Sequence, residues 1–131
     1  MASFDLLKFK SDLKREFDSF RQEANAKNVT AVLKRGRTLL EILIIGLYEG
    51  TGNRDAIPSK LEEIIQTIRK ENIISGSEGR LLNAKIVYVQ TVCNIASHYQ
   101  PDEHILLGDE VDLIEQHLHC ILEFVRKQVS N

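Results

Sequence analysis

The chain has 131 residues, of which 43% are hydrophobic and 27% charged, and its formal net charge is −2. These values fit one soluble domain with a single core and exclude the disordered and fibrous classes of chain. With only two prolines and seven glycines in the chain, helices are favoured over strands, so we expect a single all-α domain spanning residues 1–131.

The first expected helix runs from about Ser3 to Ala26. Its apolar residues recur every three or four positions and form one stripe, which is typical of an amphipathic helix with a polar outer face. The residues of this stripe are Leu6, Phe9, Leu13, Phe17, Phe20 and Ala24.

The second expected helix follows a cap at Asn28 or Thr30 and ends near Glu49, before the glycines of residues 50–53. Its second half, 39–48, is apolar almost all round apart from Glu41, which predicts a central helix. This apolar run is about half the length that a membrane span needs, so we interpret it as part of the core.

Three further helices are expected along the rest of the chain. Ser59 and Glu62 fit a capping box that opens the third, whose apolar stripe ends before a turn at residues 73–77. The fourth is expected from about Glu78 to His98, with apolar positions at Leu81, Leu82, Ile86, Val89, Val92, Cys93 and Ala96. The fifth begins at Gly108 and Asp109 and continues to about Val129. Short loops between these segments predict an antiparallel up-and-down bundle of four main helices plus one.

Charge is spread unevenly along the chain. Residues 1–40 carry nine basic and five acidic side chains, net +4, and the remainder is net −6. The difference can mark an anion-binding face, but bases and acids alternate in the first segment, which also fits a solvated surface of mixed sign. Lys34, Arg35 and Arg37 form a compact cluster that fits phosphate contact or generic surface charge.

The cysteines and the paired histidines give no metal pattern. Cys93 and Cys120 lie in apolar helical segments without a CxxC spacing, so we interpret both as buried free thiols in a reducing cytoplasm. His117 and His119 are two apart and point in different directions on a helix, which favours surface histidines. We therefore expect a cytoplasmic protein without metal or cofactor.

The strongest candidate site lies at the end of the fourth expected helix. Asn94 and His98 are four residues apart, so a helix places both on one face, either as helix-end groups or as ligand-facing groups. Arg37 and Glu41 have the same spacing on the second helix. They form either a simple intrahelical ion pair or a buried pair that orients Asn94 or His98.

The segments Arg37-Thr38-Leu39-Leu40-Glu41 and Cys93-Asn94-Ile95-Ala96-Ser97-His98 carry a family resemblance. With the capped third helix and the turn after it, residues 29–129 resemble the HEPN superfamily. The nearest likeness is to a bacterial family of unknown function often appended to restriction endonuclease subunits. Active HEPN ribonucleases have an arginine, a polar residue and a histidine at a dimer interface. In this chain Asn94 matches the polar position and His98 the histidine, but Cys93 falls at the arginine position.

This departure decides what the resemblance implies. A neutral thiol cannot replace a guanidinium that stabilises charge on phosphoryl oxygens. The resemblance therefore implies a dimeric, degenerate and non-catalytic module. Such a module serves as an accessory or regulatory binding domain for RNA, a nucleotide or a protein partner, in a setting of prokaryotic defence.

Two alternatives stay open. The first is a metal-independent endoribonuclease in which His98 is the acid or base, Asn94 orients the phosphate or base, and Arg37 is a substitute cation. The second is a structural helical adaptor whose basic first half meets an acidic partner.

Overall fold

The computed structural model describes residues 5–50, 63, 66, 76–98 and 109–129. Nearly all of them belong to four helices: α1 (Leu6–Asn25), α2 (Val29–Gly50), α4 (Gly76–His98) and α5 (Asp109–Val129). Within these ranges no residue lies in a strand, so the expected all-α class is confirmed. The expected third helix lies outside the described residues, except that Glu63 and Gln66 are helical.

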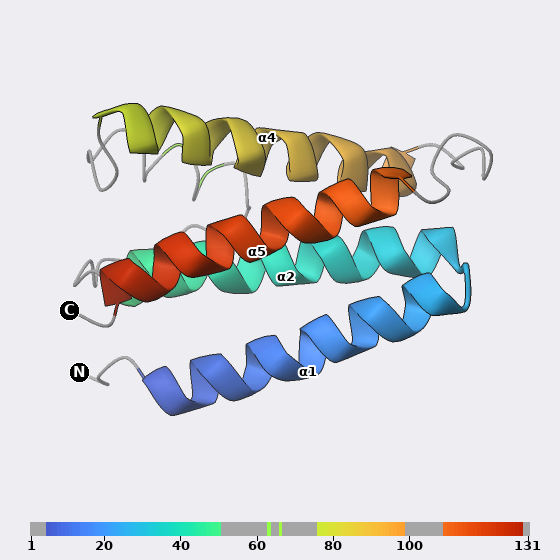
Figure 1. The fold of residues 1–131 in the computed structure, drawn as a ribbon, viewed down its shortest axis with the longest axis horizontal. Coiled ribbons are helices and arrows are strands. Elements are labelled where there is room, and N and C mark those ends of the chain that lie inside the picture. The colour runs from blue at the N-terminus through green and yellow to red at the C-terminus, as the bar shows by residue number, and fades with distance from the viewer. Residues whose placement is uncertain (1–4, 51–62, 64–65, 67–75, 99–108, 130–131) are drawn as a thin grey trace.

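The four helices pack as an up-and-down bundle around α2. The chain direction reverses from α1 to α2, from α2 to α4 and from α4 to α5 (Figure 1). Helix α2 packs against each of the other three, and α4 also packs against α5. The predicted antiparallel arrangement with a central second helix is therefore confirmed.

Side-chain and backbone caps fix the boundary between α1 and α2. The carboxylate of Asp5 accepts a hydrogen bond of 3.0 Å from the backbone N–H of Lys8, so α1 begins slightly later than predicted. The chain then turns through Lys27, whose φ of 57° is left-handed. The amide oxygen of Asn28 accepts a hydrogen bond from the N–H of Ala31 and caps α2, which selects Asn28 over Thr30.

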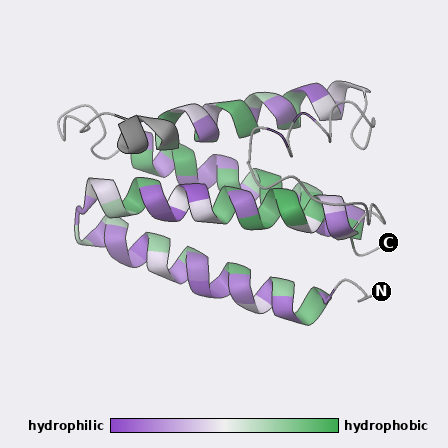
Figure 2. Cartoon of the chain, turned by 180° about the vertical axis from the view of Figure 1, so that it is seen from behind, coloured by the Kyte–Doolittle hydropathy of each residue, from purple (hydrophilic) through white to green (hydrophobic). Residues whose placement is uncertain are grey.

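The core lies along the predicted apolar stripes. Hydrophobic residues gather on the second half of α2 (Figure 2), where six side chains are at most 1% exposed. They are Leu39, Leu40, Leu43, Ile44, Leu47 and Tyr48. Phe9, Leu13 and Phe20 of α1 and Ile114, Leu118 and Ile121 of α5 pack against them. No described helix is both long and apolar enough to cross a bilayer.

Close packing of α1 on α2 depends on a glycine. The ring of Phe9 occupies the space that a Cβ atom at Gly46 would take. Further along α1, Phe17 stacks on His119 of α5 with ring centroids 4.4 Å apart, and Arg21 forms an ion pair with Glu115. These contacts hold α1 against both α2 and α5.

Two burial predictions are wrong. Leu81, assigned to the apolar stripe of α4, is 63% exposed, whereas its neighbour Leu82 is 4% exposed. Cys120 is exposed, while Cys93 is buried as predicted. Both exposed residues line a groove between α4 and α5. The predicted helical period is correct, but these two positions lie at the edge of the core and not inside it.

Candidate functional site

The candidate site begins where α2 and α4 touch. A Cβ atom built on Gly36 would lie 3.0 Å from the Sγ atom of Cys93, which is tighter than an ordinary contact. The same point lies 3.6 Å from side-chain carbons of Ile114 on α5 and Phe20 on α1. All four helices therefore converge on Gly36, and the missing side chain there leaves room for the thiol.

The Cys93 thiol is sealed and uncharged at neutral pH. Its side chain is 2% exposed. Burial raises the pKa of this thiol to about 12, and the positive charge of Arg37 acts in the opposite direction. At Cys93, α4 thus presents a neutral group that is packed against a neighbouring helix.

Arg37 and Glu41 form the predicted ion pair on α2. The Arg37 Nε atom donates to the Glu41 Oε1 atom at 3.3 Å. The side chains are 34% and 43% exposed, so the pair is half-open to solvent. The hypothesis of a buried pair is wrong, because the second half of α2 turns Glu41 toward the edge of its apolar surface. Pairs of this exposure contribute at most about 1 kcal/mol.

Asn94 and His98 lie in the last turns of α4, which ends at His98 as predicted. The structure describes their backbone as helical, and their side chains fall outside the described atoms. Cys93 lies against Gly36, and the charge of Arg37 acts on its thiol. The turn of α4 that begins at Cys93 and includes Asn94 is therefore close to Arg37. The structure thus pairs Arg37 with Glu41 and places Arg37 near Cys93, and the orientation of Asn94 and His98 stays a prediction.

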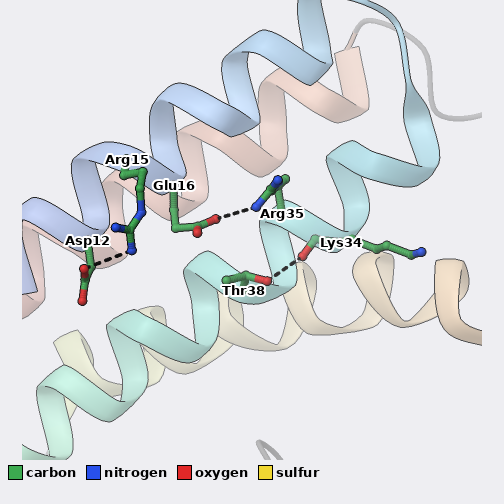
Figure 3. Close-up of polar contacts among 6 residues, drawn as sticks. All are labelled: Asp12, Arg15, Glu16, Lys34, Arg35 and Thr38. Carbon is green, nitrogen blue, oxygen red and sulfur yellow. Dashed lines mark hydrogen bonds and ion pairs between the residues drawn. The ribbon is translucent and has the colours of Figure 1, made fainter.

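The basic cluster of the sequence does not form one face. The Arg35 guanidinium donates to Glu16 of α1, while Lys34 extends away from that pair (Figure 3). The hydroxyl of Thr38 donates to the backbone oxygen of Lys34, which is a contact within α2. The charge of Arg37 instead acts on Cys93 of α4. The basic side chains of α2 therefore lie near different neighbouring helices.

The two histidines of α5 each contact an aromatic ring. His119 is exposed and stacks on Phe17, and His117 is half-buried and meets the Tyr88 ring edge-on at 4.8 Å. Partial desolvation by neighbouring side chains lowers the pKa of both imidazoles, and the charge of Lys85 lowers the pKa of His117 further. Both therefore stay mainly neutral at pH 7, and the expected surface role is correct only for His119.

The hydroxyl of Tyr88 donates to the carboxylate of Glu110 at the start of α5. Burial, together with that hydrogen bond, raises the pKa of Tyr88 to about 12. This contact fixes the start of α5 against α4, on the same side of the bundle as His117.

Sequence reasoning missed Gly36 as part of the site. A glycine inside a long helix costs about 1 kcal/mol relative to alanine, so its presence between two arginines was the available signal of a packing requirement. In the part of the chain that the structure describes, no three His, Cys, Asp or Glu side chains gather as a metal site would require.

The described arrangement is a four-helix all-α bundle with a half-exposed ion pair beside a sealed thiol. Comparison with protein-family models, with curated proteins and with solved structures found no match to this chain.

Proposed function

We propose that the chain is a degenerate, non-catalytic HEPN-like module that serves as an accessory or regulatory binding domain. Its partner classes are RNA, a nucleotide or a protein, and its setting is prokaryotic defence. The family relationship rests on the motif resemblance of residues 37–41 and 93–98, together with the four-helix bundle. Asn94, His98, Arg37 and Glu41 form its proposed binding site.

The burial of Cys93 is the observation that carries this proposal. A guanidinium at this position would have to fit into the space between α4 and Gly36, where even a Cβ atom on the glycine is tight. The thiol supplies no charge near pH 7, because its pKa is raised. Position 93 of α4 thus supplies no cation to stabilise charge on a phosphoryl group, as an active ribonuclease requires.

One observation favours a second function, the metal-independent endoribonuclease. Arg37 is 34% exposed and lies close enough to Cys93 for its charge to act on the thiol. It is therefore a cation adjacent to the α4 motif, although it comes from α2. In this alternative, His98 exchanges the proton and Arg37 stabilises the charge on the phosphoryl oxygens.

An RNA cleavage assay without metal separates the two functions. The proposal predicts that the protein at high concentration leaves a mixed RNA intact, to the same extent as a His98→Ala variant purified in the same way. Cleavage by the original chain that is lost in His98→Ala would establish the ribonuclease instead.

An RNA-binding assay at several salt concentrations tests the binding role. Ion pairs with phosphates predict an affinity that falls steeply with salt. Arg37→Ala is expected to lower the slope of that dependence by about one. Arg15→Ala is the matched control, because Arg15 also carries one positive charge, but it is 69% exposed on α1 and pairs locally with Asp12.

Equal effects of the two substitutions would show that RNA does not use the Arg37 site. Absence of RNA binding at low salt would remove RNA as the partner and favour a protein partner, including the structural adaptor with an acidic ligand. A nucleotide titration in the same buffer tests the remaining partner class.

A further inference from the structure

A groove lies between the first half of α4 and the second half of α5, far along α4 from the candidate site. Its volume is about 410 Å³. From α4 it is lined by Glu78, Leu81, Leu82 and Lys85, and from α5 its apolar lining includes Cys120 and Phe124. The four α4 residues are spaced three, one and three apart, which places them on one face of the helix.

The groove exposes apolar surface that the bundle does not cover. Leu81 is 63% exposed, the most of any large hydrophobic residue among the described side chains of α4, and Cys120 beside it is also exposed. Burying such a leucine contributes about 1.5 to 3 kcal/mol, so the surface favours a partner. Among the described side chains, the other large hydrophobic residues exposed on α4 and α5 are Val87 and Leu113, and neither lines the groove.

The order of charges on α4 indicates which kind of partner fits the groove. Glu78 precedes Leu81 by three residues, and Lys85 follows Leu82 by three. If two copies of α4 cross in opposite directions at the Leu81–Leu82 step, each Glu78 faces the Lys85 of the other copy. The sequence around the step is thus complementary to itself under a two-fold rotation, which is the property of an isologous interface.

We propose that this groove is one half of a two-fold symmetric interface between two copies of this chain. Leu81 of each copy enters the groove of the other, and two equivalent Glu78–Lys85 pairs set the antiparallel register. Two acids and two bases line the groove, since α5 adds Glu123 and Lys127. Facing copies therefore carry no excess of one charge, whereas a strongly acidic or basic partner gains nothing from this surface.

The interface separates the two candidate sites. His98 lies 16 to 17 residues from the Leu81–Leu82 step, or about 25 Å along the helix at 1.5 Å per residue. In the proposed dimer each site is therefore made by one chain, and the two sites lie at opposite ends, which differs from active HEPN ribonucleases, where the motif residues lie at the dimer interface. The inference does not depend on the proposed function, because it concerns a surface that the site does not include.

The first experiment measures the mass of the full chain by sedimentation equilibrium from about 1 to 200 μM. We expect reversible dimers, and Leu81→Asp is expected to raise the dimer dissociation constant at least about tenfold. Val87→Asp is the matched control, because Val87 is an exposed apolar residue of α4 outside the groove. Circular dichroism establishes that both variants keep their helices.

The second experiment tests the antiparallel register by charge reversal. Glu78→Lys and Lys85→Glu each place like charges opposite one another, and each is expected to raise the dissociation constant about fivefold or more. The double variant restores the pairs with their signs exchanged, so its affinity should return toward that of the original chain. An equimolar mixture of the two single variants should also associate more tightly than either alone. Residues 78 and 85 are two helical turns apart, so a direct interaction within one helix does not explain such rescue.

Three results would overturn the proposal. The original chain could remain monomeric at 200 μM, which would assign the groove to a different occupant. A dimer that Leu81→Asp leaves unchanged would use another surface. Charge reversals that weaken the dimer without rescue in the double variant or in the mixture would exclude the antiparallel crossing at the Leu81–Leu82 step.

Discussion

The two halves of α4 differ in how closely the bundle covers them. In the second half, Cys93 is sealed against Gly36 of α2, and side chains from α1 and α5 lie at the same point. In the first half, Leu81 faces an open groove beside α5. The closed half of this helix is thus the part at Cys93, and the open half is the part at Leu81, where the neighbouring Leu82 and Ile86 still face the core. The period shows which side chains can face the core. Whether such a side chain is buried depends on whether a residue of a neighbouring helix packs over it.

This difference also separates two kinds of role. The closed half removes the thiol from solvent and places a neutral group at position 93. The open half keeps apolar surface available, with Glu78 and Lys85 on either side of it. Substitutions in each half should therefore affect different properties, namely the stability of the fold and the association of the chain.

The largest expected effect is a difference in stability between substitutions at two adjacent residues, Leu81 and Leu82. Leu82→Ala removes a side chain that is 4% exposed and should lower the free energy of unfolding by about 3 kcal/mol. Leu81→Ala, at a residue 63% exposed, should lower it by less than about 1 kcal/mol when measured on dilute protein. Urea unfolding gives both values. Equal losses would mean that the groove is closed in solution.

Filling the closed half should be the next most damaging change. Gly36→Leu places a side chain where a Cβ atom already meets the Cys93 thiol, so we expect a loss of about 2 kcal/mol in the same urea assay. Ala84→Leu is the control, because Ala84 is exposed on α4 and should tolerate the change within about 0.5 kcal/mol. A Gly36→Leu chain as stable as the control would contradict tight packing at this point.

Much of the fold can be predicted from the sequence, because each helix carries both a period and a local boundary signal. The Asn28 cap and the end of α4 at His98 are where the sequence indicates them. The exposure of Leu81, of Cys120 and of the Arg37–Glu41 pair could not be predicted, because it depends on which helix lies opposite each of them. For the site, spacing brought Asn94 and His98 onto one helix, but it carried no information that Gly36 faces Cys93.

Alkaline pH should weaken the fold through the closed half by about as much as Gly36→Leu does. The pKa of Cys93 is raised from 9.0 to about 12, so the unfolded chain loses this proton first as the pH rises. The stability from the neutral buried thiol is complete below pH 9 and is lost toward pH 12; at pH 11 the loss is about 2.5 kcal/mol.

The matched measurement is the free energy of unfolding of the original chain and of Cys93→Ala at pH 8 and pH 11. The variant lacks the thiol, so its loss over this range should be smaller by that amount. Tyr88, whose pKa is also raised, is present in both chains, so most of its contribution cancels; the charge of Cys93 is the smallest cause of its shift. Parallel losses in the two chains would show that the Cys93 thiol meets solvent in the folded state.

The most direct test of the account is the reactivity of Cys93 in a Cys120→Ser chain, where it is the only thiol. A disulfide reagent at pH 8 should modify it at least about a thousandfold more slowly in the folded chain than in denaturant, since access requires opening of the bundle. The companion Cys93→Ala chain, which keeps only the exposed Cys120, should react rapidly as a dilute monomer. Modification of folded Cys93 at the rate of a free thiol would contradict the sealed contact with Gly36, and with it the proposal of a degenerate site.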